Sequence, residues 1–189
     1  YGVEYLFIVQ NITAGTFTVA DFSSTSTDNQ TLTGTSGNDT FVGGAGNDTF
    51  DGGAGSDEAY GHAGNDTFNV TDKSGAFADT LNGGPGTDTL SISYGGISSL
   101  GDFTIGYDSS TDTLTFTDAN GGVISASNFE TFSIGGVSYM FVYDGYNTTT
   151  QTSINNGTSS DISNGENNRI SHAFISSDGT QVFLYTPTS

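Results

Sequence analysis

The clearest chemical pattern in the chain is a set of aspartates that recur every nine residues within a glycine-rich stretch. An apolar residue stands two positions after each of them. Carboxylates at a fixed phase, without cysteine and with histidine scarce, offer an oxygen-only ligand set, which is the set that calcium prefers. The aspartates are Asp39, Asp48, Asp57, Asp66, Asp79 and Asp88, of which the last two follow four extra residues.

Glycines precede most of these aspartates, as in Gly43-Gly44-Ala45-Gly46-Asn47-Asp48. Glycine permits the positive φ angles of tight turns. Such turns leave backbone carbonyls without hydrogen bonds, which is costly when they are buried, and a hard cation satisfies them. A single Asp also fits an ordinary turn, because Asp tolerates turn geometry. Six aspartates at one phase favour metal ligation over turn formation alone.

The elements that position these aspartates are very short strands. The residues around each apolar position are mostly polar, so each unit predicts a strand with one side chain pointing inward. A fixed period of this kind predicts a coil whose turns each add a strand to a core. Residues 30–33 keep the strand half of the pattern, with Leu32 inward and Gln30 in place of the Asp, and predict a non-binding cap turn. The insertion 70–73 is expected to bulge outward.

Over residues 34–91 the units resemble the repeat-in-toxin (RTX) nonapeptide family, whose consensus is Gly-Gly-x-Gly-x-Asp-x-apolar-x. The resemblance implies a parallel β-roll in which two nonapeptides form one turn and calcium lies between loops of successive turns. It pairs Asp39 with Asp57, Asp57 with Asp79, Asp48 with Asp66, and Asp66 with Asp88. It also implies backbone ligands from the loop residues Gly34, Ser36, Gly37, Gly43, Ala45, Gly46, Gly52, Ala54, Gly55, Gly61, Ala63, Gly64, Gly83, Pro85 and Gly86.

The sequence departs from the consensus at several positions. Thr35 and His62 replace the second glycine of their units. The unit 74–82 lacks the first glycine and has Phe77 in place of the last one. These departures make the Asp57–Asp79 pair the least certain of the implied calcium sites.

The charge of the chain agrees with a requirement for metal. There are 21 acidic and 2 basic residues, which give a formal net charge of −19. Self-repulsion of this size opposes the compact state unless a cation neutralises it. We therefore expect the repeats to be disordered without calcium, so that binding and folding are one process. An acidic surface also argues against a nucleic-acid partner.

The chain contains no cysteine, which excludes disulfides and thiol chemistry. Calcium can replace disulfides as the cross-link of a secreted protein, so we expect an extracellular or bacterial cell-surface location. No segment reaches the roughly 18 apolar residues of a membrane helix, and no membrane insertion is expected. The chain begins at Tyr1 without a basic and apolar leader, which suggests a processed chain or a piece of a larger one.

The remaining sequence also predicts β structure, so the fold class is all-β with antiparallel strands flanking the roll. We expect N-terminal strands and a linker over 1–30, the roll over 31–92, an antiparallel meander that covers its open end over 93–144, and a low-complexity loop with a hairpin over 145–189. The strands are expected at 4–10, 15–20, 103–107, 113–117, 122–126, 130–134, 137–143, 170–176 and 180–185.

The sequence favours a structural role over catalysis. His62 and His172 lie far apart, and the carboxylates form an array instead of an acid/base pair. The leading hypothesis is a calcium-stabilised module of a bacterial surface, adhesin, matrix or filament protein. In that case the terminal strands pair with another subunit; the alternative is that they pair within the chain.

Two further hypotheses remain open. One is an accessory RTX module of a larger enzyme or toxin exported by type I secretion. The other is a carbohydrate- or ice-binding module. In the second case outward threonines form a ladder that Glu58 interrupts, namely Thr40, Thr49, Thr67, Thr80 and Thr89.

Overall fold

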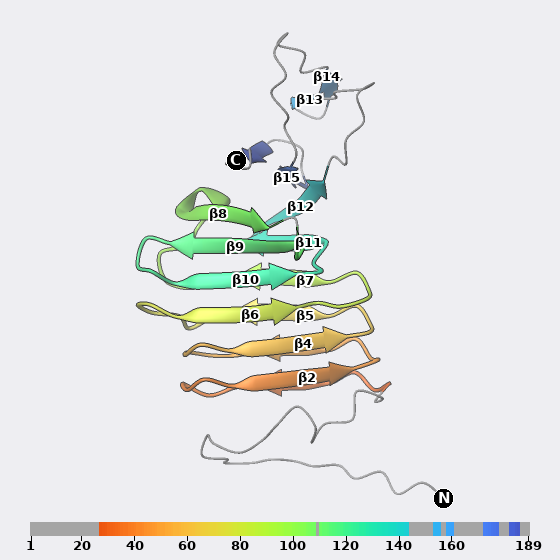
Figure 1. Cartoon of the computed structure of the whole chain (residues 1–189), viewed down its shortest axis with the longest axis vertical. Coiled ribbons are helices and arrows are strands. Elements are labelled where there is room, and N and C mark those ends of the chain that lie inside the picture. The colour runs from red at the N-terminus through yellow and green to blue at the C-terminus, as the bar shows by residue number, and fades with distance from the viewer. Residues whose placement is uncertain are drawn as a thin grey trace, which may run out of the picture.

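The computed structural model describes residues 27–108, 110–143, 153–155, 158–160, 172–177 and 182–185. Two long sheets face each other, and the chain alternates between them as it climbs (Figure 1). The first sheet contains, in spatial order, β1 (Thr31–Thr33), β3 (Thr49–Asp51), β5 (Thr67–Val70), β7 (Thr89–Ile92), β11 (Thr131–Ile134), β12 (Val137–Tyr143), β15 (His172–Ser176) and β16 (Val182–Tyr185).

The second sheet contains β2 (Thr40–Gly44), β4 (Glu58–His62), β6 (Ala78–Asn82), β10 (Val123–Ser127), β9 (Thr113–Asp118) and β8 (Phe103–Asp108), again in spatial order. A small separate sheet pairs β13 (Ser153–Asn155) with β14 (Thr158–Ser160), and a 3-10 helix, η2, spans Leu100–Asp102. Among the described residues, no helix has the length and apolar character to cross a membrane.

Strands one full turn apart pair in parallel, which confirms the β-roll. In the first sheet Leu32 pairs with Phe50, Phe50 with Phe68, and Phe68 with Leu90. In the second sheet Phe41 pairs with Ala59, and Ala59 with Leu81. The apolar position of every nonapeptide therefore falls on one of two inward ladders, as the period of nine predicts.

The inward side chains form the core of the roll. Phe50 and Phe68 are buried and stack with ring centroids 4.4 Å apart. Phe68 also meets Phe129 edge to face at 5.0 Å. Burying a side chain of this size contributes about 1.5–3 kcal/mol, and each aromatic pair adds about 0.5–1.5 kcal/mol. Since the period places these rings in register, the stack follows directly from the repeat.

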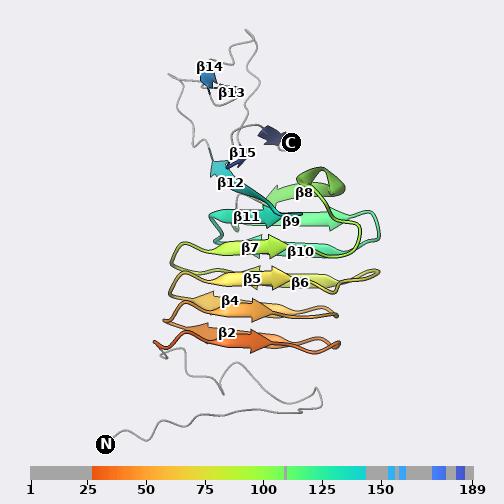
Figure 2. The same cartoon turned by 180° about the vertical axis from the view of Figure 1, so that it is seen from behind.

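The strands expected after the roll are present, but they do not form one meander. β10 pairs in parallel with β6, and β11 pairs in parallel with β7, so residues 123–134 add another turn to the roll. β8 and β9 then extend the second sheet, and β12 extends the first. The reason is that Ala126 and Phe132 continue the inward ladders beside Leu81 and Leu90. The open end is thus covered by lengthening both sheets (Figure 2).

The predicted C-terminal hairpin is also present and pairs within the chain. β15 and β16 are antiparallel, and β15 joins β12 with Phe174 opposite Phe141. Their rings lie 4.9 Å apart. This supports the intrachain alternative for β15. The strands predicted at 4–10 and 15–20 lie outside the described residues.

The insertion 70–73 does not simply bulge outward, which corrects the expectation from the sequence. Val70 ends β5, is buried, and pairs with Ile92 of β7. Asp72 takes a left-handed backbone conformation with φ of 52°. This turn directs Lys73 into the protein, where its side chain is 2 % exposed. The insertion therefore contributes one apolar and one cationic side chain to the interior.

Candidate metal centre

The turns between the two sheets form two columns, one on each edge of the roll. The first edge consists of turns 34–39, 52–57 and 71–77, which lead into β2, β4 and β6. The second edge consists of turns 45–48, 63–66, 83–88 and 128–130, which lead into β3, β5, β7 and β11. Each position of the nine-residue repeat in the turns therefore recurs along an edge, one turn above the other.

The aspartates that the resemblance pairs lie next to one another along these edges. In each pair, the backbone N–H of one Asp donates to Oδ1 of the Asp in the following turn. The donor–acceptor distances are 3.0 Å for Asp39 to Asp57, 2.9 Å for Asp57 to Asp79, 2.7 Å for Asp48 to Asp66, and 2.7 Å for Asp66 to Asp88. One oxygen of each acceptor carboxylate therefore links neighbouring turns, and the other remains for a further partner.

On the second edge, the other oxygen of two carboxylates lacks a partner. Oδ2 of Asp66 and Oδ2 of Asp88 are buried and accept no hydrogen bond from the described residues. Burial raises the pKa of Asp66, and the nearby Asp48 carboxylate adds to this effect. Burial, followed by the charges of Asp66 and Glu130, raises the pKa of Asp88 to about 6. Buried carboxylate oxygens without partners are costly, and a divalent cation would satisfy them.

The first glycine of the repeats borders the same oxygens. A Cβ added to Gly61 would lie within 3.0 Å of both Asp66 Oδ2 and the carbonyl oxygen of Gly83. Gly43 stands in the same relation to Asp48 Oδ2 and the Gly61 carbonyl. A carboxylate oxygen and a carbonyl oxygen of the next turn therefore border one small space, which only glycine leaves open. This donor set fits calcium.

The same arrangement occurs elsewhere along the edges. Gly34 would place a Cβ within 3.0 Å of Asp39 Oδ2 and the Gly52 carbonyl, and Gly83 would do so with Asp88 Oδ2 and the Asn128 carbonyl. For Gly52, the three nearest atoms all belong to Asp57. The predicted first-position ligands are thus all placed beside the carboxylate of their own unit.

The other predicted backbone ligands lie in the turns. The fourth-position glycines stack closely, since a Cβ on Gly55, Gly64 or Gly86 would lie within 3.0 Å of the carbonyl oxygen of the glycine one turn earlier. Those earlier glycines are Gly37, Gly46 and Gly64. The third-position residues Ser36, Ala45, Ala54, Ala63 and Pro85 lie between strands, and the Pro85 carbonyl accepts the N–H of Gly64 at 3.1 Å.

Glu130 is a site residue that the sequence did not reveal. Its Oε2 accepts the N–H of Asp88 at 2.7 Å, so it takes the place of the next Asp on the second edge. The parallel pairing of Thr131 with Thr89 puts the two acidic residues side by side. The sequence offered one sign of this role, because Glu130 stands two positions before the apolar Phe132, as each Asp of the repeat does. However, the glycines of the repeat are missing before Glu130, and it follows Asp88 only after 42 residues.

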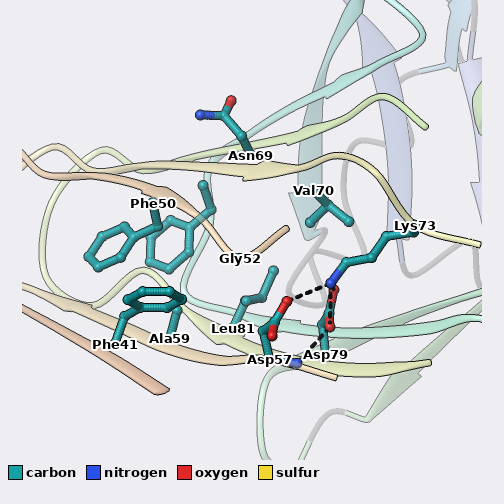
Figure 3. A pocket seen from close by; sticks show the side chains of 11 residues that line it. Phe41, Phe50, Gly52, Asp57, Ala59, Asn69, Val70, Lys73, Asp79 and Leu81 are labelled. Carbon is teal, nitrogen blue, oxygen red and sulfur yellow. Dashed lines mark hydrogen bonds and ion pairs between the residues drawn. The ribbon is translucent and has the colours of Figure 1, made fainter. Parts of the chain in front are cut away.

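Lys73 is a second residue whose role was missed. Its Nζ lies 2.6 Å from Asp57 Oδ2 and 3.1 Å from both carboxylate oxygens of Asp79 (Figure 3). It also lies 3.0 Å from the Gly55 carbonyl oxygen. Burial raises the pKa of Asp79, although the Asp57 N–H and the Lys73 ammonium act in the opposite direction. The two edges therefore differ. On the second edge the Oδ2 atoms of Asp66 and Asp88 have no partner among the described residues, whereas on the first edge the Lys73 ammonium contacts the carboxylates.

The described residues contain no group of three or more His, Cys, Asp or Glu side chains placed to hold a metal. Each space instead combines a pair of acidic side chains with backbone carbonyls, as in Asp66, Asp88 and Gly83. Calcium accepts such mixed oxygen sets.

The sequence profile of a known family of repeats agrees with this arrangement. Residues 24–59, 33–68 and 73–91 match the sequence profile of the RTX calcium-binding nonapeptide repeat, in four copies. No curated protein matches the chain. A solved structure, the extracellular lipase LipA from Serratia marcescens, is 28% identical with a TM-score of 0.31, and the match covers 57% of this chain and 14% of the lipase.

The matched segments are thus RTX repeats, and RTX repeats bind calcium ions. Bound calcium would supply two positive charges and several coordination positions between successive turns. The Asp ladders hold the turns in register, the glycines keep side chains out of the spaces beside the carboxylates, and the oxygens that border these spaces would be the ligands. The repeats themselves form a structural calcium-binding unit.

Proposed function

We propose that this chain is an extracellular structural module that folds on calcium and belongs to a bacterial surface, adhesin, matrix or filament protein. The observation that carries the calcium-dependent part is the pair of buried, unpartnered oxygens of Asp66 and Asp88. The net charge of −19 supports it, since the folded chain concentrates carboxylates that only cations can neutralise. Calcium is abundant outside cells, which supports an extracellular location.

We assign the calcium ligands as follows. On the second edge, ions lie between Asp48 and Asp66, between Asp66 and Asp88, and between Asp88 and Glu130. On the first edge, an ion lies between Asp39 and Asp57. Carbonyls of the first-, third- and fourth-position residues complete each shell. The support is the spacing of these side chains along each edge and the closeness of the first glycines to their carboxylates.

The proposal of assembly rests on the ends of the sheets. β1 and β2 end the two sheets on one side, and β16 and β8 end them on the other, among the residues that the structure describes. A strand at a sheet edge presents backbone groups that can pair with another chain. A second copy of the module, added end to end, would continue both sheets.

Electron microscopy of the purified chain tests the assembly. Samples are imaged with millimolar calcium and again after chelation, and far-UV circular dichroism is recorded in parallel. We expect ordered filaments or sheets that dissolve on chelation. Isolated particles in both conditions would contradict the assembly role and favour an accessory module of a larger type I-secreted enzyme or toxin. An unchanged circular dichroism spectrum after chelation would contradict calcium-dependent folding.

A second candidate function is binding of carbohydrate or ice. The pairing registers place Thr31, Thr49, Thr67, Thr89 and Thr131 opposite one another across five strands of the first sheet. Glu58 lies in the second sheet, so it interrupts only the ladder that contains Thr40 and Thr80. The sequence predicted a single threonine ladder interrupted by Glu58, and this is wrong, because the threonines form two separate rows, one on each sheet.

This threonine row gives a regular array of hydroxyl groups on one face, which supports the candidate. Thermal-hysteresis and glycan-array measurements on the calcium-loaded chain test it. Activity that disappears when Thr67 and Thr89 are replaced by lysine, while the fold is retained, would support binding at this face. No activity in either measurement would refute the candidate.

A further inference from the structure

The first edge contains a buried ammonium where the pattern calls for calcium. The Lys73 Nζ contacts carboxylate oxygens of Asp57 and Asp79 and the carbonyl of Gly55. Carboxylate and carbonyl oxygens of the same kinds border the spaces beside the first glycines on the second edge. Figure 3 shows the Lys73 side chain extending from the turn after Val70 to the two carboxylates.

The position of this ammonium conflicts with a calcium ion at the same pair. Calcium requires its oxygen ligands at about 2.3–2.6 Å, and Nζ already lies 2.6 Å from Asp57 Oδ2 and 3.1 Å from Asp79 Oδ2. Lys73 is also packed, with Nζ 5.2 Å from the centroid of the Phe77 ring. The side chains of Lys73 and Asp57 are each 2 % exposed, so the ammonium is enclosed. A second cation in this space would face a like charge at contact distance.

The two edges provide an internal comparison. Both Asp57–Asp79 and Asp66–Asp88 are separated by 22 residues, because the insertion lies between the members of each pair. On the second edge, Asp88 keeps an unpartnered oxygen among the described residues. On the first edge, the insertion itself supplies Lys73. The same lengthening of the turn therefore has opposite consequences for the two pairs.

The first edge also ends differently beyond this pair. Asp79 is followed in register by Ile124, whereas Asp88 is followed by Glu130. Phe77, which replaces the fourth glycine, packs edge to face on Tyr94 at 5.6 Å, and the Tyr94 hydroxyl donates to Asp118. On this edge the position in register with Asp79 is therefore no longer acidic, and the nearby buried carboxylate, Asp118, is bonded to Tyr94 and to the Gly122 N–H.

From these observations we propose that the Lys73 ammonium permanently replaces calcium between Asp57 and Asp79. The inference rests on the calcium binding of the repeats but not on their assembly. It makes Lys73 a positioning residue that joins the calcium-dependent turns to the apolar end of the protein without a metal ion.

Calcium stoichiometry tests the proposal with two matched variants. Asp79→Asn and Asp88→Asn change equivalent positions of the two edges by the same chemistry. Equilibrium dialysis followed by metal analysis of the full chain gives the number of bound ions. We expect Asp79→Asn to bind as many ions as the parent, and Asp88→Asn to bind at least one fewer. Loss of an ion in Asp79→Asn would overturn the proposal.

A measurement on the parent chain guards against variants that fail to fold. Lys73 is the single lysine of the sequence, so acylation by an amine-reactive ester and mass spectrometry of its peptide report on this site alone. We expect acylation in calcium at least tenfold slower than in urea. Acylation in calcium at the denatured rate would mean that calcium has displaced the ammonium, and would overturn the proposal.

Discussion

The calcium-free roll is expected to become more stable when the pH is lowered from 7 to 5, opposite to the usual effect of acid. The perturbed group is Asp88, whose pKa rises from 3.8 to about 6 because it is buried beside Asp66 and Glu130. The folded, calcium-free chain then binds more protons than the unfolded chain between these two pKa values. Stability is therefore gained as the pH falls through 6 and lost as it rises.

The size of the effect follows from the shift. A pKa change of about 2.2 is worth about 3 kcal/mol when complete, and about 1.3 kcal/mol of this is realised between pH 7 and pH 5. The raised pKa of Asp66 adds in the same direction. With calcium the sign reverses, because the ion needs ionised carboxylates and competes with protons.

Because the calcium-free chain is expected to be unfolded at pH 7, the effect is measured by osmolyte-induced folding of exhaustively demetallated protein at pH 7 and pH 5, followed by far-UV circular dichroism. Asp88→Asn should stabilise the calcium-free chain at pH 7 and remove about 1.3 kcal/mol of the pH dependence. Asp72→Asn is a matched control, since Asp72 is exposed and its φ of 52° suits asparagine. The reasoning is refuted if the calcium-free chain is less stable at pH 5, or if Asp88→Asn keeps the pH dependence of the parent.

Two further predictions concern the glycine spaces and the core. Gly61→Ala should raise the calcium concentration needed for half-maximal folding, because the added Cβ would meet Asp66 Oδ2. Gly95→Ala is the control and should leave this concentration unchanged, because a Cβ there would meet open space. Equal midpoints for the two variants in calcium titrations would contradict the prediction. Phe68→Ala should cost about 3–5 kcal/mol in calcium. Phe41→Ala should lower the free energy of unfolding by less, because Phe41 is half-buried and touches Phe50 only edge to face at 6.4 Å. Equal decreases for the two variants in urea unfolding would argue against the stacked core.

Much of the roll could be predicted because the repeat determines strand, turn and ligand together. The period of nine placed Phe50 and Phe68 on one ladder, and the parallel pairing has that register. The pairing of Asp48 with Asp66 came from the family resemblance, and the structure places the two residues side by side. Local residue types were sufficient here, since each turn contacts only its neighbours.

The sequence failed where residues outside the frame enter the edges. Lys73 belongs to an insertion, and nothing in its neighbours indicates that the turn at Asp72 directs it inward. Glu130 follows Asp88 only after 42 residues and without glycines, so the period could not reveal it. The position of Glu130 depends on β11 joining β7, and that of Lys73 depends on its contacts with Asp57 and Asp79, so local propensity determines neither.

The turn-by-turn ladder also has a mechanical consequence. A force that peels the chain from the β1 end would detach one turn at a time, because each turn is bonded only to the next. A turn of 18 residues would release about 60–65 Å of chain. The turn that contains Lys73 spans 22 residues and would release about 73–79 Å. The longest step would thus coincide with the turn in which an ammonium replaces the ion on the first edge, so the contribution of that edge to its resistance would not depend on the calcium concentration.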